Sequence, residues 1–311
     1  GKAASLHQLA GIYAQQGDVT KAIALYSESL QLDETIGNVQ GKAATLHELA
    51  GIYAQQGDVT RAIAFYSESL QLTETIGNVR GKAASLHQLA GIYAQQGDVT
   101  KAIALYSESL QLKETIGDVQ GKAATLANMA ALAFKQGDIN RALELLKQSA
   151  QTLALAKAYI DLLTVLNNLS VADETNGLVY LAQATWLSLR IYAPIVKTIN
   201  LIRALFNTVP QGNELEALLA STALYFCQVR GEGHPELESL QERSWEMISF
   251  AADAQGITTP EAFHTWFTQQ QLNEPEYFLP RLAQHLEAIV GDGWLFERDS
   301  FPVSGWEKIQ Q

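Results

Sequence analysis

The chain has 311 residues, of which 47% are hydrophobic and 17% are charged, a balance that favours a soluble helical protein with a continuous core. Its net charge of −12 is concentrated in residues 201–311, whose 6 basic and 16 acidic side chains exclude nucleic acid as a partner there. No stretch approaches the roughly 20 apolar residues of a membrane span, and the single cysteine excludes an internal disulfide framework. We therefore expect a cytoplasmic protein without membrane contact.

A block of 40 residues is repeated from the first residue onward. Four copies are expected at 1–40, 41–80, 81–120 and 121–160. The third copy differs from the first at two positions only, where Lys113 replaces Asp33 and Asp118 replaces Asn38. A fixed period of this length predicts a stacked solenoid, whose extended surface suits binding rather than catalysis. Because the chain opens inside a repeat, we expect a piece of a longer protein.

Each copy predicts two helices joined by a short turn. The first helix has apolar residues at helical spacing, namely Leu6, Leu9, Ala10 and Tyr13, and the second has Ala22, Ile23, Leu25, Tyr26, Leu30 and Leu32. Gly17 and Gly37 follow the two helices, as glycine does just past a helix C-terminus. Asp18 and Asn38 come next, and their side chains are expected to cap the helices that follow.

These positions resemble the tetratricopeptide repeat, in which large and small residues alternate so that paired helices pack closely. The resemblance rests on Leu6, Leu9, Ala10, Tyr13, Gly17, Ala22 and Tyr26, and on their counterparts in the later copies. The chain departs from the family at Leu6, where tryptophan is usual, at Ser29, where alanine is usual, and in lacking the closing proline. Its 40-residue unit is similar to the repeats of LGN/Pins-type proteins and of many bacterial signalling proteins. The resemblance implies an all-α, right-handed solenoid of helix–turn–helix repeats.

The repeat pattern weakens after the fourth copy. Residues 161–200 are expected to form a degenerate fifth repeat, with Leu166, Leu169, Gly177, Ala182 and Trp186 in the packing positions. Residues 201–311 are expected to form an acidic helical region that caps the stack, with helices near 192–208, 213–230, 235–255 and 274–290. Thr259 and Pro260 are expected to start a further helix. The aromatic residues Trp294, Phe296, Phe301 and Trp306 predict a tail that packs back onto the helices.

The resemblance also implies a binding surface, because the first helix of each unit lines the concave side in this family. The candidate peptide-binding residues are His7, Gln8, Gly11, Gln15, His47, Glu48, Gly51, Gln55, His87, Gln88, Gly91, Gln95, Asn128 and Lys135. Gly11 in mid-helix costs about 1 kcal/mol against alanine, and it allows either close approach of a ligand or close packing of helices. The basic residues around Lys135 either face an acidic partner or form a solvated surface.

The histidines at equivalent places, His7, His47 and His87, raise the hypothesis of a metal site. Zinc needs three or four ligands at about 2.0–2.3 Å from one ion, whereas packed helices lie about 8–10 Å apart. One ion therefore does not easily join residues of successive repeats, and we expect neither a metal nor a cofactor. A ladder of imidazoles and amides that binds a peptide is the favoured interpretation.

Catalytic motifs are weak in this sequence. Cys227 with His234, His264 or His285 is conceivable as a thiol–imidazole pair. Cys227 lies in an apolar run, however, where a lone cysteine is usually a small core residue. The spaced carboxylates near Glu236 predict a solvated helix face rather than an acid–base pair. We therefore expect a protein that is not an enzyme.

Three functions remain open at this point. The first is a protein-interaction scaffold that binds a peptide or helix of a partner in the concave groove. The second is a sensor or regulatory arm of a larger signalling protein, whose nucleotide-switch or protease domain lies outside this chain. The third is a separate C-terminal module with its own chemistry. Self-association through the uncapped N-terminal end of the solenoid is a further possibility.

Overall fold

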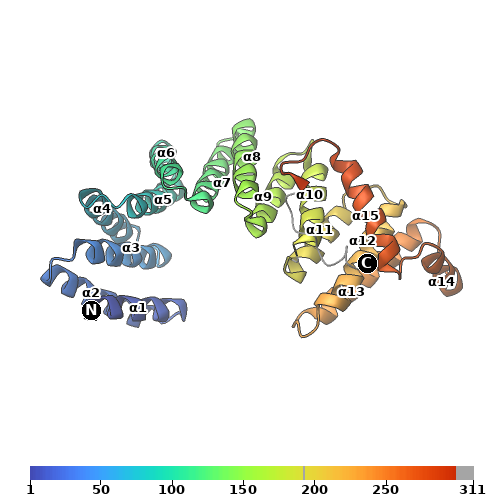
Figure 1. The fold of residues 1–311 in the computed structure, drawn as a ribbon, viewed down its shortest axis with the longest axis horizontal. Coiled ribbons are helices and arrows are strands. Elements are labelled where there is room, and N and C mark those ends of the chain that lie inside the picture. The colour runs from blue at the N-terminus through green and yellow to red at the C-terminus, as the bar shows by residue number, and fades with distance from the viewer. Residues whose placement is uncertain (192, 299–311) are drawn as a thin grey trace. The chain divides into compact units, whose positions relative to one another are not determined.

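The computed structural model describes residues 1–191 and 193–298. These residues form fifteen α-helices and no β-strand, which confirms the predicted all-α fold (Figure 1). Their contacts divide the chain into two compact units, residues 1–145 and residues 146–311. Helix α8 (Ile139–Leu155) crosses the boundary between the units.

The first unit is a stack of paired helices. They are α1 (Lys2–Gln15), α2 (Val19–Thr35), α3 (Val39–Gln55), α4 (Val59–Thr75), α5 (Val79–Gln96), α6 (Val99–Thr115) and α7 (Val119–Lys135). The first helices of successive repeats contact one another, α1 with α3, α3 with α5 and α5 with α7. No pair of second helices makes a comparable contact in the described part of the chain. The stack therefore curves with its first helices on the inner side, and the second helices follow the outer side (Figure 1).

The turns between these helices form as the sequence predicts. Gly17 and Gly37 adopt φ values of +81° and +69°, a left-handed conformation that a side chain would strain. Asp18 caps α2 by accepting the backbone N–H of Lys21 at 3.2 Å. Asn38 caps α3 by accepting a backbone N–H at 3.1 Å. The caps recur at Asp58, Asn78, Asp98 and Asp118.

The core of the first unit joins each repeat to the next. Ala10 and Ala22 are fully buried and allow the two helices of the first repeat to approach closely. Tyr26 packs in the same cluster with Leu49 and Ile52, which belong to the first helix of the second repeat. An equivalent cluster joins the second and third repeats. Repetition of this interface is what makes the fold a solenoid.

Serine replaces the usual alanine of the second helix for a reason that the structure supplies. Ser29 is fully buried, and its hydroxyl donates a hydrogen bond to the carbonyl oxygen of Ala3 at 2.9 Å. The same bond recurs from Ser69 to Ala43 and from Ser109 to Ala83, at 2.8 Å in both repeats. A buried hydroxyl without a partner would be costly, so each serine ties the two helices of its repeat together.

Ion pairs form a second repeated connection on the surface of this unit. Lys42 lies 2.9 Å from Glu34 of the preceding repeat and 2.8 Å from Glu68 of its own repeat. Lys82 makes the equivalent pairs with Glu74 at 2.6 Å and Glu108 at 2.8 Å. Each lysine thus joins two second helices through one ammonium group. The carboxylates are about half exposed, so solvent screening keeps each contribution small.

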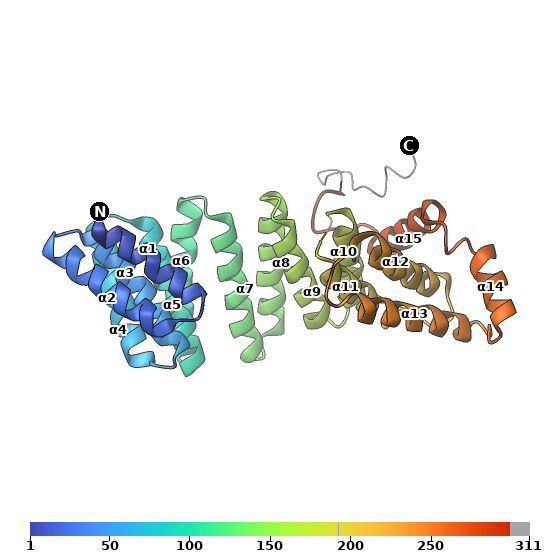
Figure 2. The same cartoon turned by 90° about the horizontal axis from the view of Figure 1, so that it is seen from below.

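The second unit is a helical array that follows the repeats. Its complete helices are α9 (Tyr159–Ala172), α10 (Gly177–Arg190), α11 (Ile195–Phe206), α12 (Glu214–Arg230), α13 (Leu237–Ala254), α14 (Pro260–Gln269) and α15 (Pro275–Val290). Figure 2 shows α12 between α13 and α15, and it packs against both. Helices α10 and α15 also pack together. Thr259 caps α14 with Pro260 at its start, as predicted.

The segment after α15 returns to α10, which confirms the prediction of a packed tail for its described part. Trp294 and Phe296 contact Trp186, with ring centroids 5.2 and 6.1 Å from that of the tryptophan. The Gln183 side chain donates to the Gly293 carbonyl and accepts from the backbone of the tail, both at 3.0 Å. Phe301 and Trp306, which were included in the same prediction, lie outside the described residues.

Two details of the second unit differ from the regular repeat. Gly177 begins α10 rather than ending the helix before it, because α9 already ends at Ala172. Pro280 lies inside α15, which is continuous from Pro275 to Val290. No helix in the described part of the chain is long and apolar enough to span a membrane.

Candidate functional site

The three equivalent histidines connect neighbouring repeats on the first helices. Nδ1 of His7 lies 3.0 Å from the hydroxyl of Thr45, and Nδ1 of His87 lies 3.0 Å from the hydroxyl of Thr125. His47 makes the corresponding bond with Ser85 at 3.1 Å. The three hydroxyl-bearing residues are fully buried, so each imidazole satisfies a polar group at the repeat junction.

The same histidines pack against the second helices through aromatic contacts. His7 and Tyr26 meet edge to face, with ring centroids 5.1 Å apart, and the later repeats copy this arrangement. The mid-helix glycines provide room for these tyrosines. A Cβ atom on Gly51 would lie 3.2 Å from the Tyr66 hydroxyl oxygen, and one on Gly11 would lie 3.4 Å from that of Tyr26. The contact is tight only at Gly51, so close helix packing accounts for that glycine, whereas a Cβ atom on Gly11 would make an ordinary van der Waals contact.

Burial controls the charge of two of these imidazoles. It lowers the pKa of His47, against the opposing effect of the Glu48 carboxylate. Burial together with the nearby Lys113 ammonium lowers the pKa of His87 to about 4. Both rings are consequently neutral at pH 7, and each offers one donor and one acceptor nitrogen.

The remaining candidate residues also lie on the first helices of the repeats. Exposed polar side chains on the first helices are Gln8, Gln15, Glu48, Gln55, Gln88, Gln95, Asn128 and Lys135. Gly11, Gly51 and Gly91 are half-buried between them. The Asn128 amide lies 3.2 Å from Nε2 of His87, so the third and fourth repeats also share a polar contact. These helices thus carry a row of hydrogen-bonding groups with a period of one repeat.

A pocket opens where the first repeat meets the second, and we name this place the first junction. The pocket has a volume of ≈ 350 Å³, and its lining includes His7, Gln8, Asp33, Gly41 and Thr45. Asp33 is only 3% exposed, and its Oδ1 accepts a hydrogen bond from the side chain of Asn38 at 2.7 Å. No described residue forms an ion pair with this carboxylate.

The place where the third repeat meets the fourth, the third junction, carries Lys113 in the position of Asp33. Lys113 is 6% exposed, and its ammonium contacts His87 Nδ1 at 3.3 Å, the Gly121 carbonyl at 3.2 Å and the Thr125 hydroxyl at 2.9 Å. Burial lowers the pKa of Lys113, while the Asp118 carboxylate opposes that shift. These substitutions are visible in the sequence, but no sequence pattern links them to a site.

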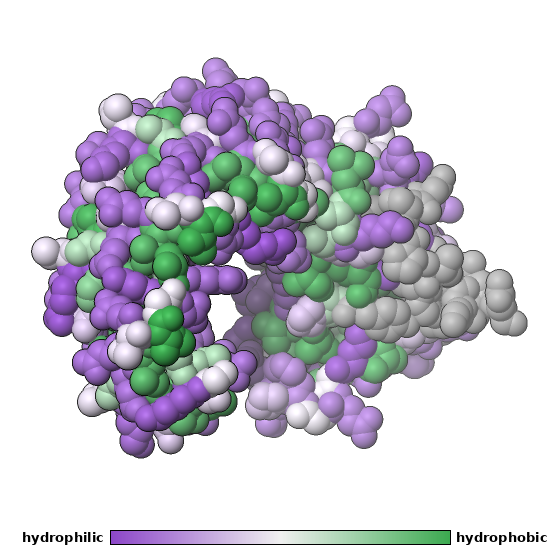
Figure 3. Space-filling view, turned by 60° about the vertical axis from the view of Figure 1, so that its left-hand side comes forward, coloured by the Kyte–Doolittle hydropathy of each residue, from purple (hydrophilic) through white to green (hydrophobic). Residues whose placement is uncertain are grey.

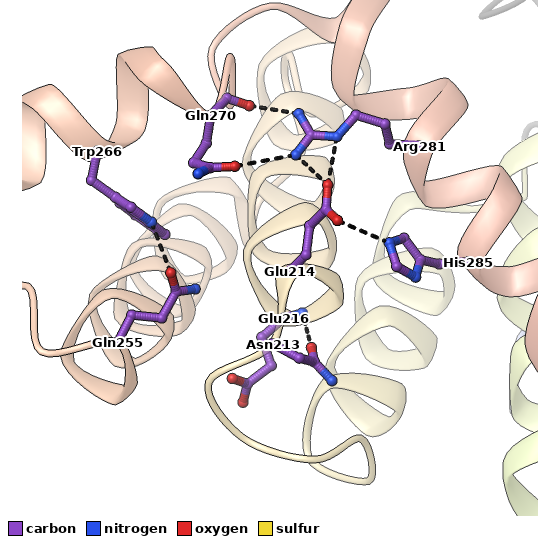
Figure 4. A network of polar contacts seen from close by, with 8 residues as sticks. All are labelled: Asn213, Glu214, Glu216, Gln255, Trp266, Gln270, Arg281 and His285. Atoms are coloured by element: carbon purple, nitrogen blue, oxygen red, sulfur yellow. Dashed lines mark hydrogen bonds and ion pairs between the residues drawn. The ribbon is translucent and has the colours of Figure 1, made fainter.

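A separate polar network lies in the second unit. Glu214 on α12 forms an ion pair with Arg281 on α15, and its other oxygen lies 3.3 Å from Nε2 of His285 (Figure 4). Arg281 also donates to the Gln270 carbonyl at 2.7 Å. Trp266 donates to Gln255 at 3.1 Å, and a pocket of ≈ 290 Å³ lies among these side chains. No sequence signal pointed to this network, because Glu214 and Arg281 are 67 residues apart.

The thiol–imidazole hypothesis lacks support in the structure. Cys227 is fully buried, which confirms the prediction of a core cysteine, and burial raises the pKa of its thiol. Its sulfur lies 3.7 Å from the Ser244 hydroxyl, and His285 contacts Glu214 instead. No group of three or more His, Cys, Asp or Glu residues is placed to hold a metal ion in the described ranges 1–191 and 193–298.

The surface combines these polar rows with separate apolar patches. Hydrophilic residues cover most of the face drawn in Figure 3, and hydrophobic residues interrupt it. On α1, Leu9 and Ile12 are 41% and 50% exposed. Their counterparts Leu49 and Ile52 on α3 are buried, because they pack against the preceding repeat.

Comparison with known proteins identifies the repeats. The tetratricopeptide repeat model matches residues 1–75 and 81–154, whereas no curated protein matches the chain. The fold is similar to the nearly identical TPR-like repeats of a protein from Podosopora anserina that is named as a kinesin light chain. That match has 22% identity and a TM-score of 0.51, and it covers 61% of this chain and 96% of the other. The apo form of RapI is similar at 12% identity and a TM-score of 0.55, covering 83% of this chain and 98% of the other. Residues 1–75 and 81–154 are thus identified as tetratricopeptide repeats by the family model, and their fold is similar to that of solved TPR-like repeats.

Proposed function

We propose that this protein is an interaction scaffold whose first helices bind an extended peptide or a helix of a partner protein. The observation that carries the proposal is the row of exposed amide and carboxylate side chains along α1, α3, α5 and α7. Solenoids of paired helices use their concave side in this way, because it presents many equivalent groups to one long ligand.

The spacing of the row supports an extended ligand. Neighbouring packed helices lie about 8–10 Å apart, and an extended chain advances about 3.3 Å per residue. Successive first helices would therefore meet about every third residue of a bound peptide. The glutamine amides suit such a ligand, because each one can both donate to and accept from a peptide group.

Rigid support of the row also favours binding. The His7–Thr45 bond and its copies fix the register between first helices. Side chains that are already placed lose less conformational freedom when a ligand binds, so more of the interaction free energy contributes to affinity.

The proposal is tested with peptides selected from a random display library against the wild-type chain. Their Kd values are then measured by calorimetry on two triple variants that each remove three exposed glutamines. One variant, Q15A/Q55A/Q95A, changes the first helices, and the other, Q31A/Q71A/Q111A, changes the second helices. We expect the first variant to weaken binding about tenfold or more, because each lost hydrogen bond contributes about 0.5–1.5 kcal/mol.

The control variant should bind as the wild type does, and circular dichroism should show equal helicity in all three proteins. The proposal is wrong if the second-helix variant loses as much affinity as the first-helix variant, or if no selected peptide depends on the first helices.

A further inference from the structure

The first and third junctions are built from the same residues at seven of nine positions around the pocket. The shared residue types are alanine, histidine, glutamine, a second glutamine, glycine, a second alanine and threonine, represented by Ala4, His7, Gln8, Gln40, Gly41, Ala44 and Thr45 in the first junction. Only Asp33 and Asn38 differ, becoming Lys113 and Asp118 in the third junction. The chain therefore contains two versions of one site with different charges.

The third junction shows which chemistry this arrangement accepts. The Lys113 ammonium lies among three acceptors, namely the His87 imidazole nitrogen, the Gly121 carbonyl and the Thr125 hydroxyl. Three acceptors match the three N–H donors of an ammonium group. An internal lysine side chain thus occupies the third junction.

The first junction offers the same acceptors without an internal cation. His7, Gly41 and Thr45 stand in the places of His87, Gly121 and Thr125. Asp33, a residue that is only 3% exposed, adds a carboxylate, yet no described residue forms an ion pair with it. Its hydrogen bond from Asn38 is neutral, and a buried carboxylate is stabilised far more by a cation.

The backbone of Gly41 lies close to the Asp33 carboxylate. A Cβ atom on Gly41 would lie 2.6 Å from both carboxylate oxygens, so a larger residue there would force the Asp33 side chain to move. The pocket beside them measures ≈ 350 Å³. That volume lies at the lower end of the range of about 300–1,000 Å³ found for ligand pockets.

We propose that the first junction is a binding subsite for a primary ammonium group of the bound peptide, held by Asp33 together with the acceptors of His7, Gly41 and Thr45. This subsite rests on the proposed peptide-binding function of the first helices. The ammonium comes from a lysine side chain or from the N-terminus of the peptide, and it occupies the place that Lys113 fills in the third junction.

The first arm of the test uses a small probe, so that it does not depend on the groove. n-Butylammonium is titrated at constant ionic strength into isotopically labelled wild-type chain, with 1-butanol as the neutral control. We expect saturable shifts of the Asn38 and Gly41 amide signals with butylammonium only. The D33N variant keeps the shape of the side chain and should bind the probe at least about tenfold more weakly.

Two double variants exchange the junctions, and each uses a residue combination that the chain already contains. D33K/N38D copies the third junction into the first, and it should abolish the probe site. K113D/D118N copies the first junction into the third, and it should create a second site with shifts at Gly121. If the aspartate at this position had only a structural role, K113D/D118N would not create a second binding site.

The second arm separates the two sources of ammonium with peptides selected on the wild-type chain. One form carries an internal lysine and an acetylated N-terminus, and the other has a free N-terminus and no lysine. The peptide form whose ammonium group occupies the first junction should bind D33N more weakly than it binds the wild type. The other form should bind both proteins alike. The proposal is overturned if wild type and D33N bind butylammonium alike, or if K113D/D118N adds no second site. Unchanged peptide binding on Q15A/Q55A/Q95A would contradict the proposed function but leave the probe result intact, so the two proposals fail separately.

Discussion

The first and third junctions share one backbone arrangement but differ in what fills it. In the first junction, Asp33 borders an open pocket and accepts a bond from Asn38. In the third junction, Lys113 occupies the equivalent position and bonds to His87 and Thr125. Both have paired helices, a capping side chain and a histidine–tyrosine contact, but the cap is Asn38 in the first junction and Asp118 in the third. The comparison shows that two substitutions reverse the charge of the buried side chain while the surrounding residue types stay the same.

The largest effect should come from removing the buried hydroxyl at each junction. T125V removes an acceptor of the buried Lys113 ammonium, whereas T45V removes only the hydroxyl that bonds to the His7 imidazole. Because bonds to charged groups are stronger, we expect T125V to lower the free energy of unfolding by about 2–4 kcal/mol and T45V by about 1 kcal/mol. Urea unfolding midpoints measure both, and equal losses would contradict the assigned role of Lys113.

The next effect concerns the dependence of stability on pH. His87 has a pKa of about 4 in the folded protein, below the value of about 6.5 expected for an unfolded chain. Between these values the unfolded state binds more protons, so this group makes the protein less stable as the pH falls from about 6.5 to 4. We expect a loss of about 1–3 kcal/mol over that window.

The K113T variant copies Thr73 of the second repeat and removes the neighbouring positive charge. It should raise the pKa of His87 and reduce the loss of stability between pH 7 and pH 5. Imidazole signals in an NMR titration report the pKa directly, and urea midpoints at the two pH values report the stability. An unchanged His87 titration in K113T would show that the ammonium does not act on this ring.

The smallest effect concerns the surface ion pairs. Lys42 pairs with Glu34 and Glu68, whereas Lys122 has one ion pair among the described residues, with Glu114. We expect K42M to cost about 0.5–1 kcal/mol and K122M less than about 0.5 kcal/mol at low salt. Both losses should shrink at high ionic strength. A larger loss of stability in K122M than in K42M would mean that the number of ion pairs does not determine how much each lysine stabilises the protein.

Much of the repeat architecture was predictable from local patterns. The left-handed Gly17 and the caps at Asp18 and Asn38 depend on residues close in sequence, and all three formed as expected. The buried Ser29 was recognised only as a departure from the family. Its function in bonding Ala3 depends on residues 26 apart, which helical periodicity does not encode.

The candidate site was predictable only in outline. The equivalent places of the histidines followed from the period, but their bonds to the next repeat span 38 residues. The importance of Asp33 was hidden, because an isolated acidic residue on a helix usually faces solvent. The informative signal was the change from Asp33 to Lys113 between two otherwise near-identical copies, and its meaning required the neighbouring acceptors to be seen in space.

The central claim, that a peptide binds along the first helices, is tested most directly by site-specific photocrosslinking. A benzophenone-bearing residue replaces Ala44, an exposed alanine of α3 in the first junction, or Ala64, an exposed alanine of α4. Each protein is irradiated with a lysine-bearing peptide that was selected on the wild-type chain. We predict a crosslink from position 44 that D33N weakens, and none from position 64. Equal crosslinking from both positions, or crosslinking from position 64 alone, would contradict the account.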